Sequence, residues 1–349
     1  PYAEDRSTIG VETDIATWRR AGMDVSTERT GIDESDEFSL EYLQKAFDEV
    51  LGGAPLLGNR SRWMRFRTVS LPRWHHENVV LIGDAAHTAH YSVGSGTKMA
   101  LEDAIVLADV LTDDQSTTLG EALQRYENIR RPRVEALQDA AVRSQRWWDS
   151  LQKRVHLHPA QLMLAYLSRG GVVSSAKLAT TDPDLLRVGL AAFAGCTPDV
   201  VDLSDVRKWV LSRPYDGPAL HTSGRLVGRD TPDGYEEASA EPSALAALRT
   251  ARPENTLVAR LDAEVADPWS AEADALVEQC SMLAAAGADG VRIDGTADRA
   301  GLLDRLAFAE RIRLDLKLLT VVGAPIEHLD DLVDGVVAGR ADLVAITSA

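Results

Sequence analysis

Short apolar runs alternate with longer segments of helical periodicity between residues 257 and 346, and this pattern restricts the fold more than any other feature of the chain. Four runs predict strands: 257–261, 290–293, 318–322 and 342–346. Three segments between them predict helices: 271–286, 302–312 and 329–337. Strands joined through helices lie parallel, so this part of the chain predicts a parallel sheet or part of a β/α barrel.

A second pattern covers residues 78–111. The continuous apolar run 78–82 predicts a strand buried on both faces, and it ends at GDAAH, residues 83–87. Gly94-Ser95-Gly96 follow, and from Thr97 to position 111 the spacing predicts a helix. Asp84 would then lie at the carboxyl end of the strand, where ligands of open α/β sheets bind.

The glycines of this pattern favour a ligand site. Gly94 and Gly96 would let backbone N–H groups approach a ligand closely, and the positive end of the helix would favour an anion or an electron-rich oxygen. The alternative is a plain strand end followed by a flexible turn. The assembled order of strand, GDAAH, GSGT and helix favours the ligand site.

The rest of the chain predicts further elements and three domains. We expect strands at 7–13 and 65–69 and helices from about 14, at 39–50 and at 119–148, the last bent near Pro132, with irregular helix over 156–194. Residues 196–255 are rich in glycine and proline over much of their length and predict a linker. The domains would be 1–195, 196–255 and 256–349.

Composition excludes several classes of protein. With 37 Lys and Arg against 54 Asp and Glu, the net charge of −17 does not attract nucleic acid or an anionic membrane. No apolar run approaches the roughly 18 residues of a membrane span. The two cysteines make no disulfide framework, so we expect a cytoplasmic protein. Residues 60–154 are instead slightly basic and rich in arginine, which suits either a phosphate-bearing ligand or a solvated helix face.

The histidines allow two interpretations. His87 and His90 can steer a substrate, or they can be packed and hydrogen-bonded structural residues, which is the commoner role. No group of His, Cys, Asp and Glu has the spacing of metal ligands, and the adjacent His75 and His76 point opposite ways on a strand.

Residues 78–111, NVVLIGDAAHTAHYSVGSGTKMALEDAIVLADVL, resemble the second FAD-binding motif of flavin-dependent aromatic hydroxylases, the group A flavoprotein monooxygenases. YSVGSGTK, at 91–98, replaces the proline-containing loop of most members, and this form is similar to that of enzymes for CoA thioesters, the salicylyl-CoA 5-hydroxylase and anthraniloyl-CoA monooxygenase type. RW at 62–63, RWHH at 73–76 and WRRAG at 18–22 resemble the same branch.

The resemblance implies a cofactor, a reaction and site residues. Asp84, after Gly83, would hold the ribityl chain of FAD, and Gly94, Ser95, Gly96 and Thr97 would lie against the pyrimidine edge of the flavin. Members of the family use NAD(P)H and O2 to hydroxylate an aromatic ring through a flavin hydroperoxide, here on an aryl-CoA. The cofactor carries this chemistry, so no catalytic side chain is expected.

The family's GxGxxG unit, which binds the FAD pyrophosphate, does not occur in this sequence. We therefore expect a partial flavin-hydroxylase fold without its N-terminal βαβ unit, supplied by a preceding segment or by a second polypeptide. A homo-oligomer is a further option.

Residues 259–346 resemble the last part of the old yellow enzyme barrel, which follows the hydroxylase in anthraniloyl-CoA monooxygenase. The resemblance places Gly323 and the pair Gly339-Arg340 at an FMN phosphate. Residues 196–255 are too few for the first half of such a barrel, so we expect a partial, degenerate barrel and no working FMN site. Two alternatives to the hydroxylase remain: a fragment of the bifunctional monooxygenase/reductase, and a non-catalytic assembly subunit.

Overall fold

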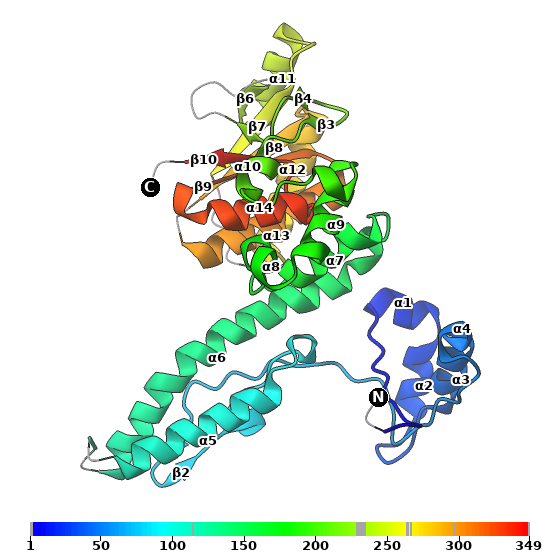
Figure 1. Ribbon diagram of the computed structural model, residues 1–349, viewed down its shortest axis with the longest axis vertical. Coiled ribbons are helices and arrows are strands. Elements are labelled where there is room, and N and C mark those ends of the chain that lie inside the picture. The colour runs from blue at the N-terminus through cyan, green and yellow to red at the C-terminus, as the bar shows by residue number, and fades with distance from the viewer. Residues whose placement is uncertain are drawn as a thin grey trace. The chain divides into compact units, whose positions relative to one another are not determined.

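The computed structural model describes residues 3–347 except 114, 117, 228–234, 263, 264, 266, 296 and 297. The chain divides into two compact units, Pro1–Gln152 and Lys153–Ala349. In Figure 1 the first unit runs from blue to blue-green and the second from green to red.

Four short helices form the first part of unit one: α1 (Ile15–Arg20), α2 (Met23–Arg29), α3 (Glu37–Ala46) and α4 (Asp48–Leu51). Aspartate side chains cap two of them, because Asp14 accepts a hydrogen bond from the N–H of Thr17 and Asp36 accepts one from the N–H of Ser39. The predicted helix start near 14 is confirmed. The helix predicted over 39–50 is confirmed as the pair α3 and α4, divided at Phe47.

The second part of unit one contains two long helices and the turns that lead into them. Its elements are β1 (His75–His76), β2 (Val79–Val80), the 3-10 turns η1 (Gly83–Ala85) and η2 (Tyr91–Val93), α5 (Gly96–Thr112) and α6 (Leu119–Asp149). Helices α5 and α6 pack against each other around a core that includes Trp74, Met99 and Tyr126. The helices predicted at 97–111 and 119–148 are confirmed, and α6 continues through Pro132.

Three predicted strands of unit one are wrong or incomplete. Residues 7–13 and 65–69 form no strand, and of the run 78–82 only Val79 and Val80 are paired, antiparallel to β1. Val79 is 60% exposed, so the run is not buried on both faces. An apolar strand is buried only where other strands and helices cover it. No described residue of unit one supplies a parallel neighbour for β2.

A six-stranded parallel sheet organises unit two (Figure 1). Its strands, in spatial order, are β5 (Leu226–Val227), β10 (Leu343–Ile346), β9 (Leu319–Ala324), β8 (Gly290–Asp294), β7 (Leu257–Asp262) and β6 (Glu236–Ser239). The connecting helices are α12 (Ala271–Ala285), α13 (Arg299–Leu316) and α14 (Leu329–Val337). The elements predicted from 257 to 346 are thus confirmed, as is the α/β class.

Different parts of unit two bury the two faces of this sheet. Leu257, Ala259 and Leu261 face one large apolar core, whereas Val258 points to the opposite face. The large core is shared with the connecting helices and with five others: α7 (Pro159–Ser168), α8 (Ser175–Thr181), α9 (Pro183–Ala194), α10 (Val206–Leu211) and α11 (Pro242–Ala251). Leu220 and Tyr215, from the hairpin of β3 (Tyr215–Asp216) and β4 (His221–Thr222), pack on the opposite face.

The segment predicted as a linker, 196–255, contributes both edge strands of the sheet, β5 and β6. Among its described residues, Gly217 and Gly224 lie in the turns that join β3, β4 and β5, so the segment is not a chain without structure of its own. Helices α7 to α9, which the prediction placed in the first domain, lie in unit two. The boundaries at 195 and 255, the partial hydroxylase fold and the partial barrel remain predictions, although β6 to β10 follow chain order as barrel strands do.

Candidate functional site

The turn after β2 carries the GDAAH motif. Gly83 has a φ of +57°, and a Cβ there would lie 3.0 Å from the Cβ of Ala100, so the position requires glycine. Asp84 is exposed, whereas Ala86 and His87 are buried. The turn thus presents one carboxylate on the surface and anchors itself through the residues on either side.

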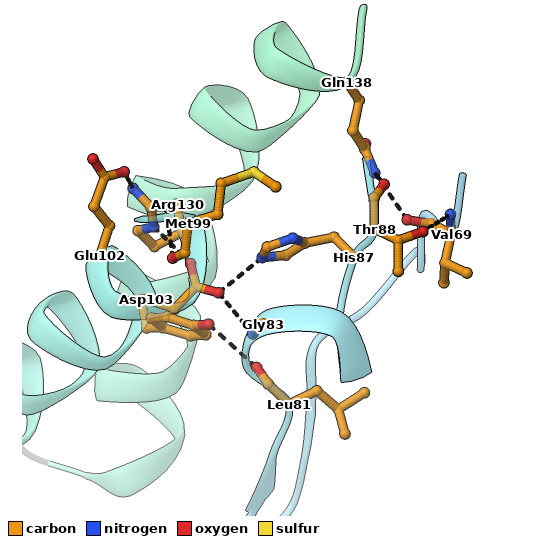
Figure 2. A network of polar contacts seen from close by, with 11 residues as sticks. Val69, Leu81, Gly83, His87, Thr88, Met99, Glu102, Asp103, Arg130 and Gln138 are labelled. Atoms are coloured by element: carbon orange, nitrogen blue, oxygen red, sulfur yellow. Dashed lines mark hydrogen bonds and ion pairs between the residues drawn. The ribbon is translucent and has the colours of Figure 1, made fainter. Parts of the chain in front are cut away.

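A single buried carboxylate, Asp103 of α5, holds this turn in place (Figure 2). Its Oδ2 accepts hydrogen bonds from the N–H of Gly83 at 2.9 Å and from Nε2 of His87 at 2.8 Å. Its Oδ1 accepts one from Nε of Arg130 at 2.8 Å. Because all three donors lie within one low-dielectric core, removal of the carboxylate would leave polar groups buried without a partner.

Arg130 of α6 supplies the balancing charge and is itself buried. Its Nη1 donates to Oε2 of Glu102 at 2.9 Å, and its Nη2 donates to the carbonyl of Met99 at 3.4 Å. Tyr126 of the same helix donates to the carbonyl of Leu81 at 3.2 Å. Helix α6 therefore fixes the position of α5 and of the segment that leads into the GDAAH turn.

His87 lies inside this network. Its side chain is 1% exposed, and its ring lies 4.9 Å from the ring of Trp74. Nδ1 has no hydrogen-bond partner among the described residues. Of the two predicted roles, this geometry supports the packed, hydrogen-bonded one, and contact with a substrate stays an untested prediction.

His90 lies in the loop before α5. Its Nδ1 accepts a hydrogen bond from the N–H of Ser92 and lies 2.8 Å from the Ser92 hydroxyl, while Nε2 lies 3.3 Å from Glu12. Burial lowers the pKa of His90, and the charges of Glu12 and Asp149 oppose this shift. His90 thus joins the loop to the N-terminal segment, and its contact with a substrate also stays a prediction.

The start of α5 is open to a ligand. Ser95 occupies the N-cap position without a side-chain capping bond, since its hydroxyl donates to the carbonyl of Val93 at 3.0 Å. Gly94 has a φ of +63°, and a Cβ built on Gly94 or Gly96 would meet nothing within 4 Å. Thr97 is exposed, and no acidic residue lies in the first turn. The first N–H groups therefore receive no side-chain cap, while the helix end favours negative charge.

These residues fit a flavin cofactor. An uncapped helix start with two open glycines suits the electron-rich edge of an isoalloxazine, and the exposed carboxylate of Asp84 suits a hydroxyl-bearing chain. The turn that carries Asp84 packs against α5 near Ala100 and Asp103, and Gly94 to Thr97 lie at the start of the same helix.

Sequence patterns did not identify the supporting residues. Asp103 stands within the quoted motif, but no pattern distinguished it from the exposed Asp109 six residues later. Arg130 and Gln138 carry no local signal. Gln138 donates to the carbonyls of both Val69 and Thr88 at 2.8 Å, and such a contact depends on how distant segments pack.

Unit two separates the positions that the barrel resemblance connected. Gly323 lies near the carboxyl end of β9, whereas Gly339 and Arg340 precede the amino end of β10. Because β9 and β10 are parallel neighbours, these positions lie at opposite ends of the two strands. Arg340 is buried, and its Nη2 donates to the hydroxyl of Ser168 at 3.2 Å. One phosphate would therefore not meet both positions.

No group of three or more His, Cys, Asp or Glu side chains in the described part of the chain is arranged to hold a metal ion. Among the helices described, none combines the length and the apolar character that crossing a membrane requires.

Comparison with known proteins finds relatives of the part of the chain that contains the site. Residues 8–141 match the family described as FAD binding domain. Salicyloyl-CoA 5-hydroxylase from Streptomyces sp is 44% identical over 184 residues, which are 52% of this chain and 35% of that protein. The 3-hydroxy-4-methyl-anthranilyl-(aryl-carrier protein) 5-monooxygenase from Streptosporangium sibiricum is 42% identical over 181 residues, 52% of this chain and 44% of that protein.

A crystal structure of a probable FAD-dependent monooxygenase from Pseudomonas aeruginosa aligns with 38% of this chain and 37% of its own at 25% identity and a TM-score of 0.28. The chain spans less than half the length of the two curated relatives. Residues 8–141 thus match the FAD binding domain family, and over about half of its length the chain is homologous to FAD-dependent aromatic hydroxylases.

Proposed function

We propose that this chain belongs to an FAD-dependent monooxygenase that hydroxylates an aromatic CoA thioester with NAD(P)H and O2. One observation carries the proposal: the uncapped, glycine-lined start of α5 follows a turn that carries the exposed Asp84 and that the buried Asp103–Arg130 ion pair holds through the N–H of Gly83. This is an arrangement in which N–H groups and a carboxylate can contact different parts of one flavin nucleotide.

The residues of the site would bind and orient, while the cofactor would carry the redox chemistry. FAD, when bound, supplies the means to activate O2 with electrons from NAD(P)H. Asp84 would accept hydrogen bonds from the ribityl hydroxyls, and the N–H groups after Gly94 would stabilise negative charge on the ring. Asp103 and Arg130 would act indirectly, because they fix the turn that positions Asp84.

The names of the relatives support the proposed substrate class. One is named for salicyloyl-CoA and the other for an anthranilyl group on an aryl-carrier protein, and the names end in hydroxylase and monooxygenase. These names favour a catalytic chain over the non-catalytic assembly subunit. We propose an aryl-CoA as the small-molecule substrate.

Exchange of Gly96 for alanine tests the cofactor site. The added Cβ meets no protein atom and alanine favours a helix, so the free energy of unfolding should not fall. If FAD approaches this backbone, the same Cβ should weaken FAD binding about tenfold, or about 1.4 kcal/mol. FAD affinity is measured by fluorescence titration of the full chain, and NAD(P)H oxidation is measured with and without an aryl-CoA.

Gly120→Ala is the matched control, because Gly120 also lies in the first turn of a long helix and a Cβ there also meets nothing within 4 Å. Its FAD affinity should equal that of the unaltered chain. The proposal fails if Gly96→Ala and Asp84→Asn both bind FAD as tightly as the control, or if the chain does not bind FAD even when it is joined to a segment that carries a GxGxxG unit.

A further inference from the structure

A groove of about 740 Å³ lies in unit one, separate from the GDAAH turn. Apolar side chains form much of its lining, and they include Ile9, Val11, Leu40, Leu43, Leu57 and Met64. Arg60 and Arg62 line it together with Trp63. The volume is in the range of sites for small organic ligands, and the lining combines an apolar interior with cationic groups.

The walls of the groove are fixed by a set of hydrogen bonds. The buried carboxylate of Asp36 accepts from Thr27 at 3.1 Å and from the hydroxyl of Ser39 at 2.8 Å, and it also accepts from Ser26. The Ser39 hydroxyl in turn accepts from Nε1 of Trp63 at 2.9 Å. These bonds join α2, α3 and the segment around Trp63.

The same segment is tied to α3 at two more points. The N–H of Asp36 donates to the carbonyl of Ser61 at 2.8 Å, and the N–H of Leu56 donates to the side chain of Gln44 at 2.6 Å. The groove is therefore formed before a ligand arrives, which lowers the entropic cost of binding.

Large apolar side chains on this groove face solvent. Leu57 is 80% exposed and Met64 is 74% exposed. Exposed apolar residues that gather in one concave, preformed site indicate a binding surface, because a ligand would remove them from water.

The segment that lines one side of the groove at Arg60 and Arg62 is positively charged, and the charge continues beyond the groove. Arg60, Arg62, Arg65 and Arg67 lie within eight residues, and no acidic residue lies among them. Arg60 is 3.5 Å from Asp33, but Arg62, Arg65 and Arg67 have no ion-pair partner among the described residues. This excess of positive charge would complement phosphate groups, which arginine binds with charge-assisted hydrogen bonds.

The segment also leads from the groove to the loop before α5. Phe66 follows the groove residue Met64, and its ring lies 5.4 Å from that of His90 and 4.8 Å from that of Tyr91. A ligand held in the groove would thus be connected through Phe66 to the loop that precedes the proposed flavin contact.

We propose that this groove binds the phosphopantetheine arm of the aryl-CoA substrate, with the arm on the apolar walls and the phosphates at Arg62 and the arginines after it. The assignment rests on the proposed function in one respect, that the substrate is a thioester. Coenzyme A fits because it joins a long, weakly polar arm to several phosphates, which matches the apolar groove beside a run of unpaired arginines.

Calorimetric titration of the full chain with coenzyme A, phosphopantetheine and pantetheine tests the proposal at about 0.15 M salt, where screening suppresses weak long-range attraction. Arg62→Gln should weaken binding of coenzyme A about tenfold. The same exchange should leave pantetheine unchanged, because pantetheine has no phosphate. Leu57→Ser should weaken all three ligands severalfold, since each carries the arm.

Matched controls separate the groove from general surface effects. Arg73 is an exposed arginine outside the groove, and Val50 is 81% exposed on α4, so neither Arg73→Gln nor Val50→Ser should change the affinity. All four replaced side chains reach solvent, so we expect the variants to fold. Equal losses for Arg62→Gln and Arg73→Gln overturn the proposal, as does a chain that does not bind coenzyme A.

Three outcomes distinguish this proposal from a carrier-protein ligand and from the proposed function. Binding of a phosphopantetheinylated carrier protein without binding of coenzyme A overturns the assignment to a CoA thioester. Groove-dependent binding of coenzyme A by a chain that neither binds FAD nor oxidises NAD(P)H, even when it is joined to a segment that carries a GxGxxG unit, supports the groove and contradicts the proposed function. Conversely, FAD-dependent hydroxylation of an aryl-CoA that Arg62→Gln and Leu57→Ser leave unchanged contradicts the groove alone.

Discussion

Asp103 shows how one residue can determine the geometry of a site without facing it. Its two oxygens accept hydrogen bonds from a backbone N–H, an imidazole and a guanidinium, and these groups belong to η1, to the chain after it and to α6. The carboxylate is buried, and so is its cationic partner Arg130. Breaking such a pair is costly, because the remaining charge stays in a low-dielectric core.

Asp103→Asn should therefore lower the free energy of unfolding by about 3 kcal/mol. The amide keeps one acceptor oxygen but loses the charge that balances Arg130, and its NH2 group meets a donor on one side. We also expect weaker FAD binding, since Gly83 loses its anchor. Urea unfolding and FAD titration measure the two effects.

Asp109→Asn, on the exposed face of the same helix, is the control and should change stability by less than about 0.5 kcal/mol. Equal stability of Asp103→Asn and this control would contradict the role assigned to the network.

At the scale of elements, long helices hold irregular segments at defined positions. Helix α6 contacts Asp103, which anchors the GDAAH turn, through Arg130, and it contacts the chain before that turn through Gln138. In unit two, helix α14 performs a similar role, because Asp334 accepts a hydrogen bond from the N–H of Ser175, the first residue of α8, at 2.9 Å. Asp334 thereby satisfies an N–H group that α8 itself leaves free.

The burial of Asp334 makes the stability of unit two depend on pH. Burial raises the pKa of Asp334 to about 6, although Ser175 and Arg340 lower it. The native state then binds a proton that the unfolded chain releases between pH 4 and pH 6, so this group's contribution to stability falls as pH rises through that window. Above pH 6 the buried carboxylate destabilises the fold.

Asp334→Asn should consequently stabilise unit two at pH 8, by up to about 3 kcal/mol, and the gain should shrink towards pH 4. The amide oxygen can still accept from Ser175. Thermal unfolding across this pH range provides the measurement, with Glu278→Gln, an exposed change on α12, as the control. A gain that is larger at pH 4 than at pH 8 would show that the sign is wrong.

At the scale of the whole molecule, the reactivity of the cysteines reports on unit two alone. Both cysteines belong to unit two: Cys196 is partly exposed, and Cys280 is buried within the large apolar core. Burial raises the pKa of the Cys280 thiol to about 12. Because the thiolate is the reactive form, Cys280 should react only when unit two opens.

A thiol reagent at pH 8 should therefore modify one cysteine per chain rapidly and the second only at the rate of opening. In Cys196→Ser the fast phase should disappear. Asp103→Asn, which alters unit one, should leave the slow phase unchanged. Fast modification of two thiols in the native chain would contradict the burial of Cys280.

Local patterns predicted the elements from 257 to 346 because helix and strand periodicities are properties of neighbouring residues. The same reasoning over-predicted strands at 7–13 and 65–69, where no partner strand is described. It also predicted burial for the run 78–82, but burial depends on what covers a strand. Asp84 and the glycines at 94 and 96 could be proposed from their order in the chain, whereas the groove beside Trp63 could not.

The sequence by itself determined the α/β class, most of the helices and the position of the GDAAH turn, since these follow from side-chain periodicity and from glycine at particular points. Only the tertiary structure decided that Asp103 joins Gly83, His87 and Arg130, and that α3 and the segment around Trp63 enclose a groove. The reason is physical: such contacts join residues far apart in the chain, and the energy of a buried polar group depends on the partners that packing brings to it.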